Sequence, residues 1–340
     1  MTPRERVMAA LAGQPVDRPP VSFWGHFYHL ESSAADLVRA TRESWQRHAW
    51  DWIKLNPRKH YHVEPWGVRY VYTSVPGEKP MLTDWPIHEG ADWAAIGRQP
   101  LDRPAFAEQL EAVRLLRAAV PGEVPIIQTV FTPLAILGEM VETPQQLRAH
   151  MDSHGGLVRG ALAAVTDSFV PFVRALLEAG ADGIYFATVD WASRDLMSPD
   201  DYRAWARPTD LALIEAARGA AFNVLHVCKR RNLLFELADY PVQAFSWAAT
   251  DATNPSLADG LARLGRAVMG GITQDGALQQ GDASAALAEL DDARHQTHGR
   301  HWLVAPGCSI PPGTPEGNLA AIRDAVERLA PATERSPQPG

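Results

Sequence analysis

Residues 222–228 read FNVLHVC, an apolar run that ends in His226 and Cys228. In an extended strand, residues two apart point the same way, so these two side chains would project together while Val227 faces the opposite side. A neutral imidazole and a thiolate on one face are two of the ligands that a zinc ion prefers. Cys308, the other cysteine of the chain, also follows an apolar run. A three-ligand zinc site therefore requires that His226, Cys228 and Cys308 converge.

The apolar run at 222–227 is one of eight predicted strands that alternate with helical patterns. Such alternation implies parallel pairing, and eight units favour closure into a (β/α)8 (TIM) barrel. An open doubly wound sheet is the alternative, but no glycine-rich phosphate-binding fingerprint follows the first strand. We expect one barrel domain over residues 1–330. The predicted strands are 21–25, 52–56, 124–130, 182–187, 222–227, 242–247, 267–272 and 302–305.

Two segments depart from this alternation. Residues 57–100 are rich in proline, glycine and tryptophan, and YHVEPWGVRYVYTSVPG at 61–77 indicates a long inserted loop or hairpin after the second strand. The last ten residues, 331–340, are proline-rich and polar, which predicts a disordered tail.

Composition narrows the class of protein. The chain has 340 residues, 46% of them hydrophobic and 21% charged, which is typical of a globular protein with a sizeable core. A net charge of −8 argues against an extended nucleic-acid footprint. Two cysteines cannot build a disulfide framework and suit a reducing compartment. The N-terminus lacks the apolar core of a signal peptide, and no apolar segment reads as a bilayer span. We expect a cytoplasmic protein without a nucleic-acid or membrane partner.

In a parallel barrel, the active site forms where strands end and the following loops begin. His226, Cys228 and Cys308 all occupy that position. The fifth and eighth strands are not neighbours, so the three side chains would meet across the barrel mouth.

Several segments together resemble the uroporphyrinogen decarboxylase superfamily, and the resemblance runs over nearly the whole chain. They are GADGIYFATVDW at 180–191, SPDDYRAWARP at 198–208, LHVC at 225–228, VMGGI at 268–272 and APGCSIPPGTPEGNL at 305–319. This superfamily has an (α/β)8 barrel and at least two branches. One branch contains the decarboxylase of haem biosynthesis. The other contains zinc-dependent, corrinoid-linked methyltransferases of the methylcobalamin:coenzyme M type.

The zinc motif of the methyltransferase branch is His-x-Cys followed far downstream by Cys, and His226, Cys228 and Cys308 match it residue by residue. The resemblance implies a bound zinc ion. It also implies a corrinoid carried by a separate partner protein, since the chain shows no DxHxxG-type cobalamin-binding motif. One departure is Lys229, which stands where relatives usually have glycine after His-x-Cys.

The signature of the decarboxylase branch is missing. Those enzymes carry an arginine-rich stretch after the first strand that grips the carboxylates of the substrate, whereas residues 23–31 here read FWGHFYHLE without arginine. The late histidine of the decarboxylases corresponds to Cys308 in this chain. A substrate with many carboxylates needs cationic partners, so both absences count against decarboxylation.

Zinc held by two thiolates and one imidazole has no net formal charge and keeps a fourth position for a substrate. A small-molecule thiol there would lose its proton and stay nucleophilic enough to attack a methyl group carried by a corrinoid. The leading hypothesis is therefore a zinc-dependent, methyltransferase-like enzyme. The alternatives are a lyase acting on a porphyrinogen or other polycarboxylate and a non-catalytic metal- or ligand-binding barrel. In the plainest interpretation, the cysteines are small buried hydrophobes and the histidine belongs to the core.

Aromatic and polar side chains are expected around the mouth. The first predicted strand runs into Trp24, His26 and Tyr28, and aromatics at this edge can hold a flat or apolar substrate. His26 is alternatively a further ligand or a proton carrier. In the second strand, Lys54 shares a face with Trp52, so either that face or the face of residues 51, 53 and 55 lines the barrel. Further polar candidates at strand ends are Gln128, Tyr185 and Asp190, and Glu139 is a candidate fourth ligand.

Lys229, Arg230 and Arg231 follow the central strand where a short helix is predicted to begin. Cations are unfavourable at a helix N-terminus, so one interpretation is a site for an acidic group of the substrate. The other is a solvated cluster balanced by nearby acids such as Glu236.

Overall fold

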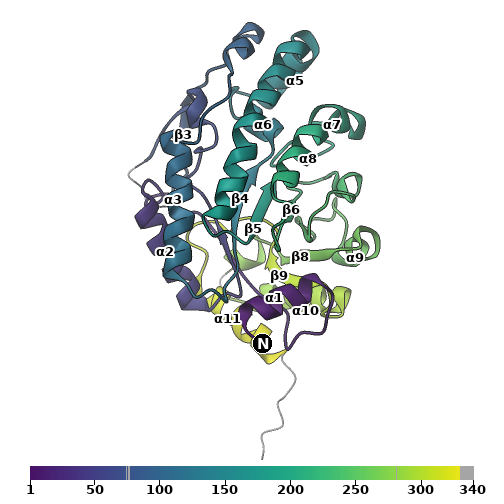
Figure 1. The fold of residues 1–340 in the computed structure, drawn as a ribbon. Coiled ribbons are helices and arrows are strands. Elements are labelled where there is room, and N and C mark those ends of the chain that lie inside the picture. Colours follow the sequence, from purple (N-terminus) through teal and green to yellow (C-terminus); the bar gives the residue numbers. More distant parts are fainter. Residues whose placement is uncertain (74, 76, 281, 330–340) are drawn as a thin grey trace, which may run out of the picture.

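The computed structural model describes residues 1–73, 75, 77–280 and 282–329, so the predicted tail at 331–340 lies outside the described residues. Seven parallel strands form one curled sheet in the order β1-β4-β5-β6-β7-β8-β9, with helices packed on its outer side (Figure 1). The strands are β1 (Ile53–Leu55), β4 (Ile126–Phe131), β5 (Gly183–Ala187), β6 (Val224–His226), β7 (Ala244–Ser246), β8 (Ala267–Ile272) and β9 (Trp302–Pro306). The helices are α1 (Pro3–Leu11), α2 (Ala34–His48), α3 (Pro104–Ala119), α4 (Pro133–Gly138), α5 (Pro144–Ser153), α6 (Gly155–Glu178), α7 (Pro199–Trp205), α8 (Arg207–Ala216), α9 (Leu257–Leu264), α10 (Ser284–Thr297) and α11 (Glu316–Arg328).

The first predicted strand, 21–25, is not a strand of this sheet. It makes isolated parallel bridges, Val21 with Val304 of β9 and Gly25 with Ile310. On its other side, the Asp51 N–H donates to the Val21 carbonyl at 2.9 Å. The two preceding residues are prolines, which offer no N–H to extend a ladder. Segment 20–25 therefore connects β9 to the chain entering β1 through a few hydrogen bonds.

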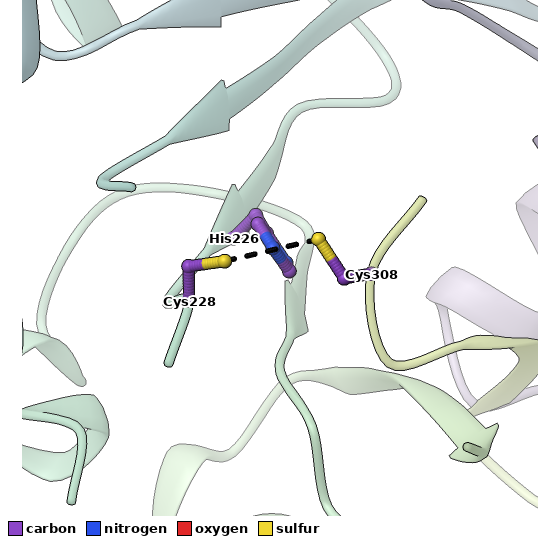
Figure 2. Close-up of side chains that lie close together, drawn as sticks. All are labelled: His226, Cys228 and Cys308. Atoms are coloured by element: carbon purple, nitrogen blue, oxygen red, sulfur yellow. Dashed lines mark hydrogen bonds between the residues drawn. The ribbon is translucent and has the colours of Figure 1, made fainter. Parts of the chain in front are cut away.

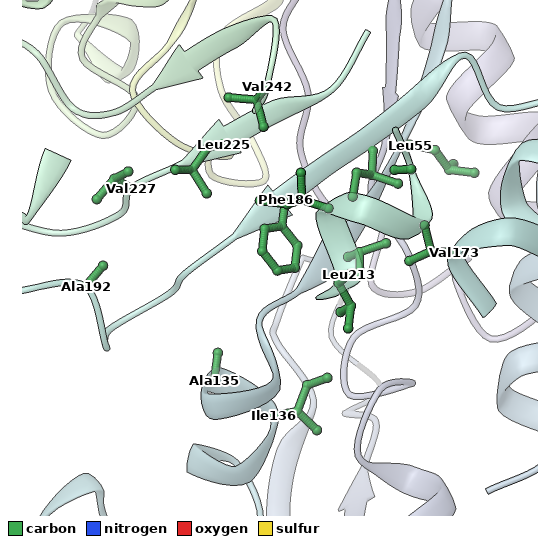
Figure 3. Packing of buried hydrophobic residues seen from close by; sticks show 14 of the residues in the cluster. Leu55, Ala135, Ile136, Val173, Phe186, Ala192, Leu213, Leu225, Val227 and Val242 are labelled. Carbon is green, nitrogen blue, oxygen red and sulfur yellow. The ribbon is translucent and has the colours of Figure 1, made fainter. Parts of the chain in front are cut away.

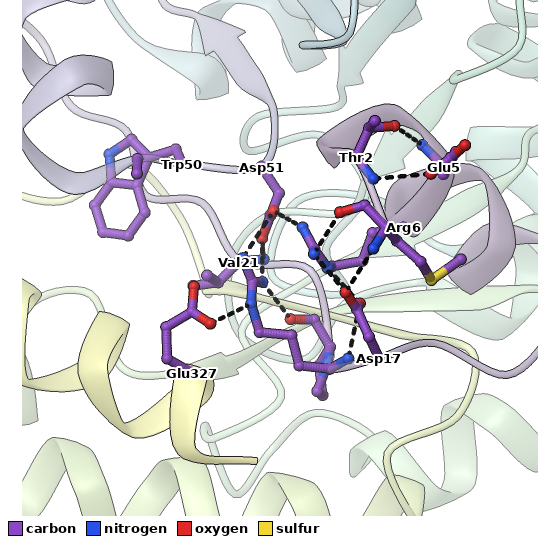
Figure 4. Close-up of polar contacts among 12 residues, drawn as sticks. Thr2, Glu5, Arg6, Asp17, Val21, Trp50, Asp51 and Glu327 are labelled. Atoms are coloured by element: carbon purple, nitrogen blue, oxygen red, sulfur yellow. Dashed lines mark hydrogen bonds and ion pairs between the residues drawn. The ribbon is translucent and has the colours of Figure 1, made fainter. Parts of the chain in front are cut away.

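A buried polar cluster fixes this connection (Figure 4). The Asp51 carboxylate accepts from the guanidinium groups of Arg6 and Arg18, each at 2.6 Å, and from the Val21 N–H at 2.8 Å. Asp51 is 1% exposed. Because a buried carboxylate is tolerated only when it is paired and hydrogen-bonded, the cluster joins α1, segment 20–25 and the start of β1 as one unit.

Side chains alternate between two apolar layers, as the period of a strand requires. The outer layer contains Phe186 of β5 and Leu225 of β6 together with Val173 of α6 and Leu213 of α8 (Figure 3). The inner layer also receives Val7 from α1, which crosses one end of the sheet (Figure 1). The cavities of about 120 and 530 Å³ that contain the candidate site residues lie at the opposite, carboxyl ends of the strands. The inner layer consists of Val7, Trp24, Trp52, Ile127, Tyr185, Phe222, Val224, Ala244, Ala267, Met269, Leu303 and Ala305.

An antiparallel pair lies between β1 and α3, in the region where the sequence predicts a hairpin. It consists of β2 (Arg69–Val71) and β3 (Met81–Asp84) and is flanked by the 3-10 turns η1 (Glu64–Trp66) and η2 (Gly90–Ala95).

Helix α6 departs from the expectation that no apolar segment could span a bilayer. Its 24 residues include a window of mean hydropathy 1.4, which meets the length and composition of a membrane span. Half of that window is buried, and α6 contacts α8, η2 and α4. A core helix that packs on several neighbours has the same apolar composition.

Candidate functional site

The structure brings His226, Cys228 and Cys308 together at the carboxyl ends of the strands (Figure 2). His226 is the last residue of β6, and Cys228 and Cys308 each lie two residues beyond the end of a strand. Their ligand atoms all lie within 4.8 Å of one another, and the two sulfurs are 3.8 Å apart. Both cysteines are free thiols.

This geometry fits a tetrahedral zinc ion. Two Zn–S bonds of about 2.3 Å at a tetrahedral angle separate their sulfurs by about 3.8 Å, which is the spacing between Cys228 and Cys308. The Nε2 atom of His226 is buried and has no hydrogen-bond partner among the described residues. A buried nitrogen without a partner is costly, so this atom is the one that a metal ion would satisfy.

Neighbouring side chains orient the imidazole. Nδ1 of His226 lies 3.2 Å from the Ser246 hydroxyl, which in turn lies 3.1 Å from the Tyr185 hydroxyl. The Tyr185 ring stacks on the imidazole with a centroid distance of 5.0 Å. Hydrogen bonds of this kind select the tautomer of a ligating histidine, so Ser246 and Tyr185 hold Nε2 toward the cysteines.

The two thiols of the cluster differ in acidity. Hydrogen bonding from Cys228 lowers the pKa of Cys308 well below the usual thiol range, and His226 lowers it further, against the opposing effect of burial. The same contact and burial raise the pKa of Cys228. Cys308 is therefore the more readily ionised sulfur, and a thiolate is the form that binds metals.

A cavity of about 120 Å³ opens beside the cysteines, and Lys54 is one of its charged side chains. The sequence left open which face of this strand points inward, and the structure places Trp52, Lys54 and Asn56 on the inner face. Lys54 is 6% exposed and hydrogen-bonds to Asn56, and its ammonium lies 4.6 Å from the centre of the Tyr185 ring. Burial lowers the pKa of Lys54 to about 7, although the nearby cysteines raise it. The cavity is lined by His26, Lys54, Asn56, Pro57, Lys59, Thr129, Phe131, Tyr185, Ala187, Val189, His226, Cys228, Cys308 and Ser309.

The loop after segment 20–25 contributes unequally to this site. His26 lines both the 120 Å³ cavity and a neighbouring cavity of about 530 Å³. Trp24 lines the larger cavity and lies 5.5 Å from Tyr185 by ring centroids. Tyr28 lines neither and stacks on the His26 ring instead, and burial raises the pKa of its hydroxyl to about 12.

Several predicted site residues lie outside this cavity. Gln128 alternates with the cavity residue Thr129 along β4, so its side chain faces the outer layer. Glu139 is engaged by Lys59 at 3.1 Å, His60 at 2.9 Å and His62 at 3.1 Å, and it is not part of the cluster that His226, Cys228 and Cys308 form among the described residues.

The basic triplet is also placed differently from the anion site considered for it. Lys229 pairs with Asp190 at 2.8 Å, and Arg231 pairs with Asp195 at 2.8 Å, with side chains about half exposed. The helix expected to begin here is a 3-10 turn, η3 (Leu234–Leu237), so a helix N-terminus does not act on these charges. The placement agrees with the interpretation of a solvated cluster balanced by nearby acids. The acids that pair with it are Asp190 and Asp195 rather than Glu236.

Sequence reasoning missed Ser246, Glu31 and Lys59. Ser246 is the last residue of β7 and pairs with His226 of β6 across the sheet. This pairing depends on how the strands align, which the distance between the two residues in the sequence does not show. Glu31 and Lys59 lie in irregular loops, where no periodicity predicts the direction of a side chain.

Comparisons with known proteins confirm the family resemblance seen in the sequence. A family model described as uroporphyrinogen decarboxylase (URO-D) matches residues 2–329. A methylcobamide:CoM methyltransferase (MtaA) of Methanosarcina barkeri is 28% identical over 345 residues, which cover 94% of this chain and 96% of the relative. A uroporphyrinogen decarboxylase of Mycobacterium sp. (strain KMS) is 31% identical over 159 residues, which cover 45% of this chain and 42% of the relative. The solved structure of a methyltransferase from Methanosarcina mazei has the same fold, with a TM-score of 0.80 over 97% of this chain and 99% of that chain at 23% identity.

Proposed function

Because this chain belongs to the uroporphyrinogen decarboxylase (URO-D) family, we propose that it works as one of the family's methyltransferases and activates a small-molecule thiol for methyl transfer from or to a corrinoid. Likeness to methyltransferases along nearly the whole chain favours a transferase over a decarboxylase. The observation that carries the proposal is the convergence of His226, Cys228 and Cys308 with the sulfur spacing that zinc requires.

The chain's own residues define what the site does. His226, Cys228 and Cys308 would hold the metal, with the His226 ring fixed by Ser246. When bound, zinc would favour the thiolate form of a substrate thiol. Lys54 is buried beside the cysteines and, when protonated, would favour an anionic sulfur in the 120 Å³ cavity.

The corrinoid is proposed to arrive on a partner protein. The 120 Å³ beside the cysteines accommodates a small thiol and is far too small for a corrinoid ring. The methyl group would therefore be presented at the mouth from outside. We propose a cytoplasmic location, with a corrinoid protein as the partner and neither nucleic acid nor membrane.

We also propose how the sheet closes into a barrel. We infer that segment 20–25 acts as the eighth strand and closes the barrel, since it hydrogen-bonds both to β9 and to Asp51 at the start of β1. The β2–β3 pair is then an inserted hairpin at the mouth, since Gly77 in the loop between its strands lines the 530 Å³ cavity together with Pro312.

The decarboxylase alternative has a specific weakness in this site. The cavity beside the cysteines contains two lysines, Lys54 and Lys59, and no arginine, and Lys59 is already paired with Glu139. A porphyrinogen with many carboxylates would lack the paired cationic contacts that such groups require.

The test is a transfer assay with free methylcobalamin and candidate thiols, run beside an assay for carbon dioxide release from uroporphyrinogen. Thioether formation by the wild-type protein, absent in Cys228→Ser and Cys308→Ser, is the expected result. Release of carbon dioxide by metal-free protein would establish the lyase instead. Stable metal binding without turnover of any thiol would favour the non-catalytic barrel.

A further inference from the structure

A carboxylate and an imidazole form a buried pair at the mouth, apart from the three converging ligands. The Oε2 atom of Glu31 lies 3.0 Å from Nδ1 of His26. Glu31 is fully buried, and its Oε1 atom accepts the Lys59 backbone N–H at 2.8 Å. Both carboxylate oxygens are thus engaged, so the position of Glu31 relative to the His26 ring is fixed.

The orientation of the ring leaves one nitrogen available. Tyr28 stacks on the His26 ring with a centroid distance of 4.8 Å and an interplanar angle of 10°. A carboxylate at Nδ1 holds the proton of a neutral imidazole on that nitrogen. Nε2 has no hydrogen-bond partner among the described residues and is therefore the atom left to accept a proton.

His26 lines two neighbouring cavities. His26 lines the 120 Å³ cavity together with Cys228 and Cys308, and it also lines the 530 Å³ cavity next to it. The His26 imidazole therefore lies between the 120 Å³ cavity and the 530 Å³ cavity.

Lys54 is the competing proton acceptor near the ring, because burial lowers its pKa to about 7. A Lys54→Met variant, assayed with an acidic and a weakly acidic thiol, should lower kcat/KM for both by similar factors if His26 is the base. The remaining neighbours are Tyr28 and Lys59. The pKa of Tyr28 is raised to about 12 by burial, so its hydroxyl keeps its proton. Lys59 is already paired with Glu139 at 3.1 Å. The charged groups that act on His26 are Glu31, Lys59 and Lys54. Burial favours neutral His26, and Glu31 partly offsets this, which suits a base that must be unprotonated before it acts.

We propose that His26 is the catalytic base that accepts the proton of the substrate thiol and that Glu31 is its positioning residue; this rests on the proposed function. The S–H bond of the substrate breaks, and its electron pair stays on sulfur as the thiolate. A new N–H bond forms at Nε2, and the imidazolium is stabilised by the Glu31 carboxylate at Nδ1. The proton then passes to solvent by way of the 530 Å³ cavity.

The test compares two thiols of similar size and different acidity. Ethanethiol is almost wholly protonated at pH 8, whereas 2,2,2-trifluoroethanethiol is largely ionised and needs no base. We expect His26→Gln to lower kcat/KM for ethanethiol by about 100-fold or more and to lower it for the fluorinated thiol much less. Added imidazole should restore part of the loss, and His88→Gln, at an exposed position, is the matched control.

A second readout does not depend on turnover. Calorimetric titration of thiol in two buffers of different ionisation enthalpy counts the protons released on binding. Both proteins should release about one proton per thiol at pH 8, but in stopped-flow mixing with a pH indicator the release should be much slower in His26→Gln than in the wild type.

Glu31 has its own test. Replacing it by Gln removes the charge that favours the imidazolium, so the acid limb of the kcat/KM profile should move to lower pH, and Glu31→Asp should restore part of the wild-type profile. Equal losses for the two thiols in His26→Gln, or an unmoved profile in Glu31→Gln, would overturn the assignment while leaving the proposed function intact. Absence of thiol turnover by the wild-type protein would overturn both.

Discussion

At the scale of single residues, two buried polar groups that lack a full set of partners indicate where a ligand would bind. The buried Nε2 of His226 has no partner among the described residues, whereas its Nδ1 is held by Ser246. Lys54 is buried with only Asn56 as its hydrogen-bond partner in the same part of the chain. Buried polar groups are normally satisfied, so both atoms point to something that binds between them.

Lys54 and Lys229 form a matched pair for testing this interpretation. Lys54→Met should weaken binding of an anionic thiol about tenfold, because the cavity loses its unpaired cation; that change corresponds to about 1.4 kcal/mol. Lys229→Met should change binding less than about threefold, since Lys229 is half exposed and already paired with Asp190. Dissociation constants from calorimetry decide between the two. Equal effects would show that Lys54 has no special role.

At the scale of elements, the ends of β6 and β9 bring the ligands together, and segment 20–25 sets the shape that lets them meet. The sequence predicts seven strands of the sheet by their apolar runs because a strand buried on both faces reads as a continuous apolar stretch. It also predicts the convergence of His226, Cys228 and Cys308, since parallel strands end at one edge. It cannot predict that segment 20–25 makes only bridges, because that depends on backbone pairing after two prolines.

Asp51 tests the role of that segment. Asp51→Asn should lower the free energy of unfolding by about 1.5–3 kcal/mol, because it removes the buried charge that Arg6 and Arg18 share, while Arg6 keeps Asp17 and Arg18 keeps Glu327 as partners. Glu215→Gln removes an exposed pair with Arg218 and should cost less than about 1 kcal/mol. Urea denaturation measures both. A loss for Asp51→Asn no larger than that of the control would contradict the joining role of the cluster.

At the scale of the whole molecule, stability should depend on pH through a buried acid far from the thiols. Asp210 of α8 is fully buried and accepts hydrogen bonds from Tyr202 at 2.8 Å and Tyr240 at 3.0 Å. Burial raises the pKa of Asp210 to about 7, although both tyrosine hydroxyls act in the opposite direction. The sequence does not reveal this group, since an aspartate on a helix is usually exposed.

Stability should decrease as pH rises, because the pKa of Asp210 is higher in the folded protein than in the unfolded chain. The folded protein binds the proton of Asp210 more tightly than the unfolded chain does, so its stabilising contribution is complete below about pH 4 and is lost as pH rises to about 7. At about 1.4 kcal/mol per pH unit, the loss is about 4 kcal/mol. Asp210→Asn should lack this slope, so the difference in unfolding free energy between wild type and variant, measured by urea denaturation, should change by about 4 kcal/mol between pH 4 and pH 8. An unchanged slope would contradict the assignment.

The central claim is that the His226, Cys228 and Cys308 side chains form one zinc site. The direct measurement is the metal content of the purified protein by mass spectrometry, with X-ray absorption at the zinc edge to identify the bound atoms. We expect about one zinc per chain in the wild-type protein, with two sulfur ligands and at least one nitrogen ligand, and a large loss of zinc in Cys308→Ser. Wild-type protein that binds no zinc when zinc is supplied, or a Cys308→Ser variant that keeps its full zinc content, would contradict the claim.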